Sequence, residues 1–335
     1  MSIKTILVAN NHLNSVGGSE TFTYAMIESL ISKGYSVEYF TFSKGITSDK
    51  IEYDLGVKFM SKSRYDLILA NHHPCVKFLS IKGITIQTCH GIFPKLEYPS
   101  KFSDGYVSIS EEIKQHIYKS GFKSELILNG INCERYTPTS SLNHKLSSVL
   151  SLSQSSLANK KIEEACIKLG VKFIKLNKFV NPIWNVENLI NQADLVIGLG
   201  RSAYEAMACG RATVVYDQRE YNSSKADGYM IPEHVSECVL NNCSGRYHNL
   251  EYQVEDLINC FKLYNPKDGA DLREHALKCF NIKHATEQYI TYAETLKKRH
   301  GFLALQLIHC YQFIKQVKQK YKFKRRAKSA NPRQD

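Results

Sequence analysis

The stretch 193–216 constrains the fold of this chain more than any other part of the sequence. Its apolar run 195–197 is typical of a strand that is covered on both faces. Gly198 and Gly200 follow and allow the backbone to turn tightly. A helix is expected after this turn, because Gly210 provides a stop signal before the apolar residues resume. The order strand, glycine turn, helix and strand predicts a βαβ unit, and therefore an α/β protein.

The start of the predicted helix is suited to an anionic ligand. A helix that begins near Arg201 or Ser202 points its free N–H groups and the positive end of its dipole into the glycine turn, where they can bind a diphosphate. Glu205 lies about one turn further along, where a carboxylate can accept hydrogen bonds from a ribose diol. The alternative is a plain βαβ unit in which Glu205 is buried or forms a salt bridge.

The sequence Tyr-Glu-Ala-Met-Ala-Cys-Gly-Arg at 204–211, followed by a Val-Val strand, resembles the donor-sugar motif of retaining GT-B nucleotide-sugar glycosyltransferases. In that family the glutamate that matches Glu205 holds the ribose of the sugar nucleotide. The resemblance covers residues 3–297 and rests on Gly17-Gly18, His90-Gly91, Asn129-Gly130 and the Glu205 segment, in the family's order. It implies an α/β fold of the GT-B type, in which two Rossmann-like domains face a cleft.

Residues 4–9 predict a buried first strand. Gly17 and Gly18 close the polar loop between this strand and the first predicted helix. This start lacks the Gly-x-Gly-x-x-Gly fingerprint of dinucleotide enzymes, so the sequence does not support NAD binding. The resemblance implies that the glycine loop contacts the phosphates of the donor and the acceptor.

Two further motifs belong to the predicted N-terminal domain. His90 follows the predicted strand 84–89, and ligands of open α/β sheets bind beyond the carboxyl ends of strands. The resemblance makes His90 the catalytic candidate, since it matches a histidine that contacts the transferred sugar; the alternative is a loop histidine with a structural hydrogen bond. Asn129 and Gly130 match a segment whose implied role is structural, at the floor of the cleft.

The sequence departs from the family pattern where the diphosphate is expected to bind. Family members place an Arg just after the first strand of the second domain and a Lys several residues later. Here Ser153 or Gln154 occupies the Arg position, and Lys160 or the next lysine can serve as the Lys. The family also pairs two glutamates, but the position eight residues before Glu205 holds Ile197. Arg201 either supplies the lost phosphate contact or is a structural residue at the helix start.

The net charge of +12 is concentrated near the C-terminal end of the sequence. Residues 296–335 carry a net +11, so the remainder is close to neutral. This segment predicts a basic amphipathic helix, which is typical of binding to an anionic membrane surface. The residues expected at the membrane are Leu303, Leu307, Ile314, Lys318, Lys322, Lys324, Arg325 and Arg326. The alternatives are packing on a partner or on the protein itself and, as a third option, nucleic-acid binding, which we do not expect.

The cysteines give no sign of a metal site. There are 10 of them, with no Cys-x-x-Cys pair and no zinc-type spacing, which favours reduced thiols in a cytoplasmic protein. No signal peptide or transmembrane run is recognised. We therefore expect no metal, no cofactor other than a nucleotide-sugar co-substrate, and peripheral association with the inner face of the membrane.

We expect an acceptor domain at 1–140, a compact donor domain at 141–280, a crossing helix at 281–298 and the basic tail at 299–335. The predicted function is transfer of a sugar, with retention, from a UDP- or GDP-linked donor to a saccharide or lipid-linked acceptor in surface polysaccharide or lipopolysaccharide assembly. The alternatives are a non-catalytic GT-B subunit that positions a partner enzyme, and a GT-B-like sugar-nucleotide epimerase.

Overall fold

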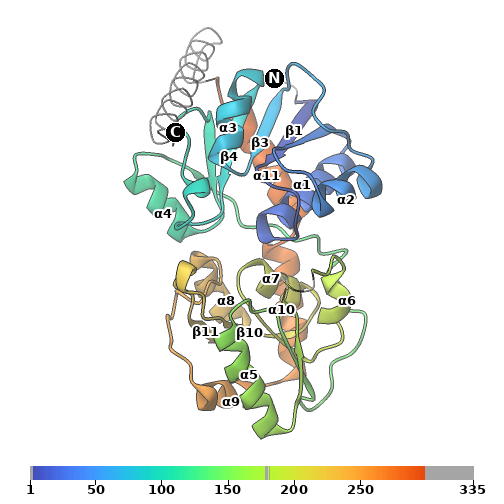
Figure 1. Cartoon of the computed structure of the whole chain (residues 1–335), viewed down its shortest axis with the longest axis vertical. Helices are drawn as coiled ribbons and strands as arrows, with labels where there is room; N and C mark the ends of the chain where they lie inside the picture. Colours follow the sequence, from blue (N-terminus) through green and yellow to red (C-terminus); the bar gives the residue numbers. More distant parts are fainter. Residues whose placement is uncertain (1–2, 178–179, 181, 299–335) are drawn as a thin grey trace, which may run out of the picture.

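The computed structural model describes residues 3–177, 180 and 182–298, which form two α/β domains stacked along the long axis of the molecule (Figure 1). The N-terminal sheet has the order β2-β1-β3-β4-β5-β6, and its neighbouring strands are parallel. Its strands are β1 (Thr5–Asn10), β2 (Ser36–Thr41), β3 (Leu67–Ala70), β4 (Ile84–Cys89), β5 (Gly105–Ser108) and β6 (Glu125–Leu126). Its helices are α1 (Gly18–Ser32), α2 (Ile46–Leu55), α3 (His73–Leu79) and α4 (Glu111–Lys119).

Strand β1 shows why this sheet is buried on both faces. Successive side chains of a strand point to opposite sides, so a continuous apolar run supplies two cores. Ile6 and Val8 pack with the residues of α1, whereas Leu7 and Ala9 pack with those of α3 on the other face. The first strand and the glycine turn into the first helix are therefore confirmed, with α1 beginning at Gly18.

The C-terminal sheet has the order β11-β10-β9-β7-β8, and only the pairing of β10 with β11 is antiparallel among the strands described. Its strands are β7 (Ser148–Ser151), β8 (Lys172–Lys175), β9 (Leu195–Gly198), β10 (Ala212–Tyr216) and β11 (Ala226–Tyr229). Its helices are α5 (Ser156–Leu169), α6 (Val186–Ile190), α7 (Arg201–Ala208), α8 (Pro232–Cys238), α9 (Val254–Lys262) and α10 (Pro266–Cys279). The predicted βαβ unit is confirmed as β9-α7-β10.

Helix α11 (Ile282–Thr295) leaves the C-terminal domain and packs on the N-terminal one (Figure 1). Ile282, Ala285 and Tyr289 belong to the same apolar core as α1. The backbone of Ile131 donates to Phe280 at 2.6 Å and accepts from Ile282 at 2.9 Å, which joins the inter-domain connection to the start of this helix. The helix crosses between domains as the resemblance implied.

Gly130 is needed where α11 approaches the connection between the domains. A Cβ atom at this position would lie 2.6 Å from Cδ1 of Ile282 and 2.8 Å from its Cα. Because the Cα atom of Ile282 cannot move away without shifting the start of α11, glycine is required at position 130 for close packing. Gly130 therefore allows the close packing of α11 on the connection between the domains.

The sequence 233–245 shows turn and loop signals, which predict no helix, but the structure has one there. Helix α8 begins at Pro232, a residue that is favoured in the first turn because it has no N–H to satisfy there. Val235 and Cys238 are buried in the same core as α7. Tertiary packing stabilises this short helix, and its residues alone gave too little periodicity to reveal it.

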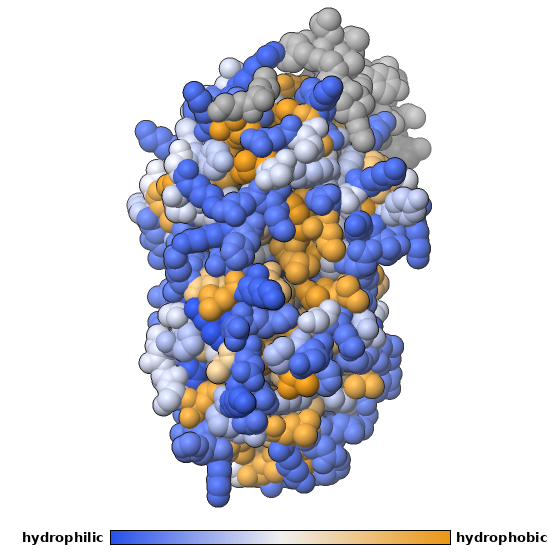
Figure 2. All heavy atoms as spheres, turned by 180° about the vertical axis from the view of Figure 1, so that it is seen from behind, coloured by the Kyte–Doolittle hydropathy of each residue, from blue (hydrophilic) through white to orange (hydrophobic). Residues whose placement is uncertain are grey.

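Apolar side chains gather along the waist between the two domains on the face shown in Figure 2, and hydrophilic residues cover most of the rest of that face. No helix among residues 3–177, 180 and 182–298 is long and apolar enough to cross a membrane. The predicted tail, 299–335, including its proposed membrane-binding residues, lies outside the described residues.

Candidate active site

A cavity of about 280 Å³ lies between the two domains, beyond the carboxyl ends of strands from both sheets. This is where ligands bind in open α/β sheets. The predicted site residues that line it are Gly17, Gly18, His90, Asn129, Gly200, Arg201, Ser202 and Glu205. Four other predicted residues, Gly130, Ser153, Lys160 and Gly198, are not among the lining residues.

Glu205 lies on α7 with only 7% of its surface exposed. Burial raises the pKa of its carboxyl group, while the charges of Arg201 and a hydrogen bond from the Tyr136 hydroxyl lower it. The ion pair joins Nη2 of Arg201 to Oε1 of Glu205 at 3.3 Å, at the i, i+4 spacing of one helix face. The carboxylate therefore faces the cavity beside a cation and a phenol, both of which orient it.

Arg201 also contacts the other domain. Its Nη1 donates to the carbonyl oxygen of Gly130 at 2.6 Å and lies 3.5 Å from Oδ1 of Asn129. Its Nε is buried and has no hydrogen-bond partner among the described residues. Both terminal nitrogens are thus engaged by protein groups, which favours the structural role for Arg201 over a role as the main phosphate ligand.

The turn before α7 has the geometry that the sequence indicated. Gly200 has φ 53° and ψ −123°, a conformation that is accessible mainly to glycine. Its N–H donates to the carbonyl of Cys243 at 2.9 Å, which fixes the turn against the loop after α8. Gly200, Arg201 and Ser202 line the cavity, so the first turn of α7 and the positive end of its dipole lie at the cavity wall. Gly198 ends β9 and packs against Ser202.

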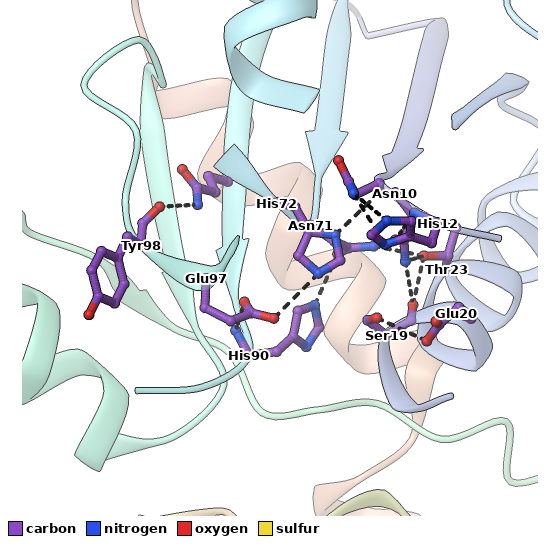
Figure 3. Close-up of polar contacts among 12 residues, drawn as sticks. Asn10, His12, Ser19, Glu20, Thr23, Asn71, His72, His90, Glu97 and Tyr98 are labelled. Atoms are coloured by element: carbon purple, nitrogen blue, oxygen red, sulfur yellow. Dashed lines mark hydrogen bonds and ion pairs between the residues drawn. The ribbon is translucent and has the colours of Figure 1, made fainter. Parts of the chain in front are cut away.

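His90 follows β4 and enters the cavity from the N-terminal domain (Figure 3). Its Nε2 donates to Oδ1 of Asn71 at 3.0 Å, and its backbone N–H donates to Oε2 of Glu97 at 2.7 Å. The ring meets Phe22 edge-on, with centroids 5.0 Å apart. Burial lowers the pKa of His90 to about 4, so the ring is neutral at pH 7. With its Nε2 donating, a neutral ring has Nδ1 as a hydrogen-bond acceptor.

A polar network behind His90 connects it with the glycine loop (Figure 3). Asn71 donates to Oγ1 of Thr23 at 2.7 Å, and Asn10 donates to the same oxygen at 2.9 Å. Thr23 in turn donates to the carbonyl of Ser19 at 2.7 Å. The ends of β1 and β3 therefore hold both the histidine and the first turn of α1 in fixed positions.

Glu97 is a site residue that the sequence did not reveal. It is 7% exposed, and one oxygen accepts from the backbone of His90 while the other lies 3.4 Å from Nε2 of His72 (Figure 3). It ends a short 3-10 helix, Lys95–Glu97, in the connection after β4, where no motif or periodicity marks it. Its carboxylate fixes the backbone at His90 without facing the cavity directly.

Of the residues after β7 that we expected to bind the diphosphate, one is buried, one is exposed on a helix and one lines the cavity. Ser153 is 1% exposed, and its hydroxyl donates to Oδ1 of Asp217 at 2.5 Å. Lys160 is exposed on α5. Gln154 does line the cavity, together with Arg219, which comes from the loop after β10. Arg219 was not predicted, because it lies outside the four motifs that carry the resemblance.

One wall of the cavity is apolar. It includes Leu152, Leu176, Ile183 and Val186, with Trp184 beside them. Trp184 meets Tyr24 of the N-terminal domain edge-on, with ring centroids 4.9 Å apart. A flat, largely apolar group such as a nucleobase fits a wall of this kind. This wall was not predicted, because apolar residues such as these are equally typical of a protein core.

Acidic groups are scarce at the cavity. Among the described residues that line it, Glu205 is the only acid, and Arg201 already pairs with it. Within the described part of the chain, no group of three or more His, Cys, Asp and Glu residues is arranged to hold a metal ion. The described cavity wall therefore interacts with a ligand mainly through hydrogen bonds and through the dipole of α7.

No protein-family model matches this chain, and a comparison with curated protein sequences finds no match. Solved structures do match. Anabaena Alr3699/HepE in complex with UDP and glucose is similar over 88% of this chain and 100% of its own, with 14% identity and a TM-score of 0.60. AviGT4, a glycosyltransferase involved in avilamycin A biosynthesis, is similar over 87% of this chain and 97% of its own, with 11% identity and a TM-score of 0.55. The chain has the GT-B fold.

The catalytic domain of starch synthase IV from Arabidopsis thaliana, bound to ADP and acarbose, is also similar, over 88% of this chain and 99% of that domain. Its identity is 11% and its TM-score 0.54. At these identities the similarity defines the fold, and the chemistry has to be argued from the residues of the cleft. The GT-B fold expected from the sequence motifs is confirmed.

Proposed function

We propose that this GT-B protein is a glycosyltransferase that moves a sugar from a nucleoside diphosphate donor to a saccharide acceptor. One observation carries the proposal: a single inter-domain cavity is lined by Gly17, Gly18 and His90 from one domain and by Glu205 and the start of α7 from the other. The similar structures that hold UDP with glucose and ADP with acarbose support it.

Each part of the donor has a place in this proposal. The nucleobase lies on the apolar wall that includes Leu176, the ribose diol donates to Glu205, and the diphosphate lies at the first turn of α7. The sugar then points toward His90 and the glycine loop. In the transition state the leaving diphosphate gains charge, and preorganised N–H groups stabilise that charge most when water is excluded.

We infer further that transfer retains the anomeric configuration, as the sequence resemblance implies. The only acid among the described lining residues is Glu205, which is paired with Arg201 and hydrogen-bonded by Tyr136. No second carboxylate of the described wall is in position to act as a covalent nucleophile. NMR of the product anomer tests this part of the proposal, and an inverted product would refute it.

The acceptor is proposed to be lipid-linked, in assembly of a surface polysaccharide or lipopolysaccharide on the cytoplasmic face of the membrane. The support is the basic amphipathic pattern of the sequence 299–335. The full chain should bind anionic liposomes and be released by salt, and deletion of residues 300–335 should abolish binding. Equal partitioning of the truncated and full-length chains would refute the membrane role.

A non-catalytic subunit is the second candidate, and Ile197 is the observation that favours it. This residue is fully buried in β9, packed in the apolar core beside α5, at the position where the family's first motif glutamate was expected. A sugar-nucleotide epimerase is a third candidate, which would turn over donor without an acceptor. Turnover measured with and without a panel of acceptors separates the three.

Thermal melting across UDP, GDP, ADP and their sugars is the first experiment. A ligand present at 100 times its dissociation constant stabilises the native state by about 2.7 kcal/mol, so a true donor raises the melting temperature. Glu205→Gln should remove the shift because the ribose loses its charged acceptor. If no nucleotide shifts the melting temperature of the wild-type protein, the proposed function is wrong.

A further inference from the structure

The cleft needs a cation for a diphosphate, and few of its cationic side chains are available. Three described lining residues are basic: His90, Arg201 and Arg219. His90 is neutral at pH 7, since burial lowers its pKa to about 4. Arg201 is bound to Glu205 and to the carbonyl of Gly130. Arg219 therefore remains as the cation with unfilled donor capacity at this wall.

Arg219 is held from one side only. Its Nε donates to Oδ2 of Asp217 at 2.5 Å. Its Nη1 lies 3.5 Å from the hydroxyl of Tyr221, at the limit of a hydrogen bond, and its Nη2 makes no hydrogen bond with the described residues. The two terminal nitrogens form the edge of the guanidinium that binds phosphate oxygens in a bidentate manner.

Asp217 is built to hold this arginine. It is fully buried, and its Oδ1 accepts from the Ser153 hydroxyl at 2.5 Å and from the backbone N–H of Gln218 at 2.8 Å. Its negative charge lies on the buried side of the guanidinium, while the Arg219 side chain is 19% exposed. The terminal nitrogens of Arg219 thus face the cavity. Ser153, which we predicted as a phosphate ligand, instead donates to the carboxylate of Asp217 that holds Arg219.

The position in the sheet explains how Arg219 can replace a ligand after β7. In the order β10-β9-β7, the strands β10 and β7 flank β9, and α7 begins directly after β9. Because neighbouring strands are about 4.8 Å apart, the carboxyl ends of β10 and β7 lie about 10 Å from each other. A long side chain from either end can therefore reach a ligand at the first turn of α7, from opposite sides.

We propose that Arg219 is the diphosphate-binding cation of this cleft and that Asp217 and Ser153 are its positioning residues. The inference rests on the proposed function, since it concerns the same donor site. It assigns the phosphate contact to the end of β10 instead of the β7–α5 segment, where Lys160 is exposed and outside the lining.

Calorimetric titration with the nucleoside, its monophosphate and its diphosphate tests this proposal, using the base that melting experiments identify. Arg219→Gln should weaken diphosphate binding about 10- to 100-fold, the range expected for lost charge-assisted hydrogen bonds, and should leave nucleoside binding within about twofold. The unchanged nucleoside affinity shows that the variant is folded. Lys172→Gln serves as the control, because Lys172 is exposed and begins β8, at the end of the strand away from the cavity.

Two further variants separate binding from positioning. Arg219→Lys keeps the charge but loses the fork, so its affinity for the diphosphate should lie between those of the wild type and Arg219→Gln. Asp217→Asn should also weaken diphosphate binding without changing nucleoside binding, because the guanidinium loses its charged anchor. A melting curve confirms folding of each variant.

The outcomes distinguish this inference from the function on which it rests. If the wild type binds the diphosphate and Arg219→Gln binds it equally well, the inference is wrong and the function stands. A loss confined to Lys160→Gln would equally overturn it, in favour of the segment after β7. If the wild type binds no nucleotide, the proposed function fails and the inference fails with it.

Discussion

Replacing Arg201 by Met tests the buried ion pair with Glu205 most directly. Arg201 and Glu205 are each 7% exposed, and the guanidinium also binds the carbonyl of Gly130 at 2.6 Å. Removing one partner of a buried pair leaves an uncompensated charge, which costs about 3–5 kcal/mol. At about 2–3 °C per kcal/mol for a protein of this size, Arg201→Met should lower the melting temperature by about 6–15 °C at pH 7.

The pH dependence of this loss has a defined sign. Burial raises the pKa of Glu205, and without Arg201 the pKa rises further because its main compensating charge is gone. A carboxyl group with a raised pKa in the folded state destabilises the fold as pH rises, and this effect vanishes below its unfolded pKa. The melting temperatures of Arg201→Met and the wild type should therefore converge as pH falls from 7 to 5.

A double-mutant cycle completes this test. Glu205→Gln in the Arg201→Met background removes the unpaired charge, so the double variant should be more stable than the sum of the two single changes implies, by about 1.5–3 kcal/mol. The exposed variant Lys172→Gln gives the baseline for surface changes. Additive effects, or a loss of less than about 1 kcal/mol for Arg201→Met, would refute the buried ion pair.

Three other predictions follow from single contacts. Gly130→Ala should destabilise the protein by about 1–3 kcal/mol, measured by melting, because its Cβ meets Ile282 at 2.6 Å. On acidification to pH 5, the free energy of unfolding of His90→Gln should fall by up to about 2 kcal/mol less than that of the wild type. The reason is that folding lowers the pKa of His90 from 6.5 to about 4, so at pH 5 the unfolded chain binds a proton that the native state does not. Glu205→Gln should lower kcat/KM of donor turnover about 100-fold or more; activity near the wild-type value would exclude a ribose contact.

The sequence predicted the elements that local patterns encode. The unit β9-α7-β10 follows from an apolar run, two glycines and a stop at Gly210, and all of these act over short distances. The placement of His90 and Glu205 at one cavity was also predictable, because strand ends of parallel sheets converge and the motif order fixes the domains.

The residues that the sequence did not reveal depend on contacts between distant segments. Arg219 enters the cleft only because Asp217 anchors it, and Asp217 in turn is fixed by Ser153 from another strand end. Glu97 is 7 residues from His90 in the chain, at the end of a 3-10 helix that is too short to show a periodicity in the sequence. Such positions are set by tertiary packing, which single-sequence patterns do not contain.

Under the proposed function, Ile197 at the position of the family's first motif glutamate changes where sugar recognition is expected to come from. Ile197 faces the core on the α5 side of the sheet, so the C-terminal domain offers the sugar no carboxylate at that position. Among the described lining residues, the polar side chains of the N-terminal domain include His90 and Asn129, and the network through Asn71 holds the histidine in place. Under the proposed function, we expect the C-terminal domain to bind the nucleotide and the N-terminal domain, together with the acceptor site, to discriminate between sugars. Arg201 binds Glu205 in one domain and Gly130 in the other, so under the proposed function we expect donor binding at Glu205 to affect the relative position of the two domains.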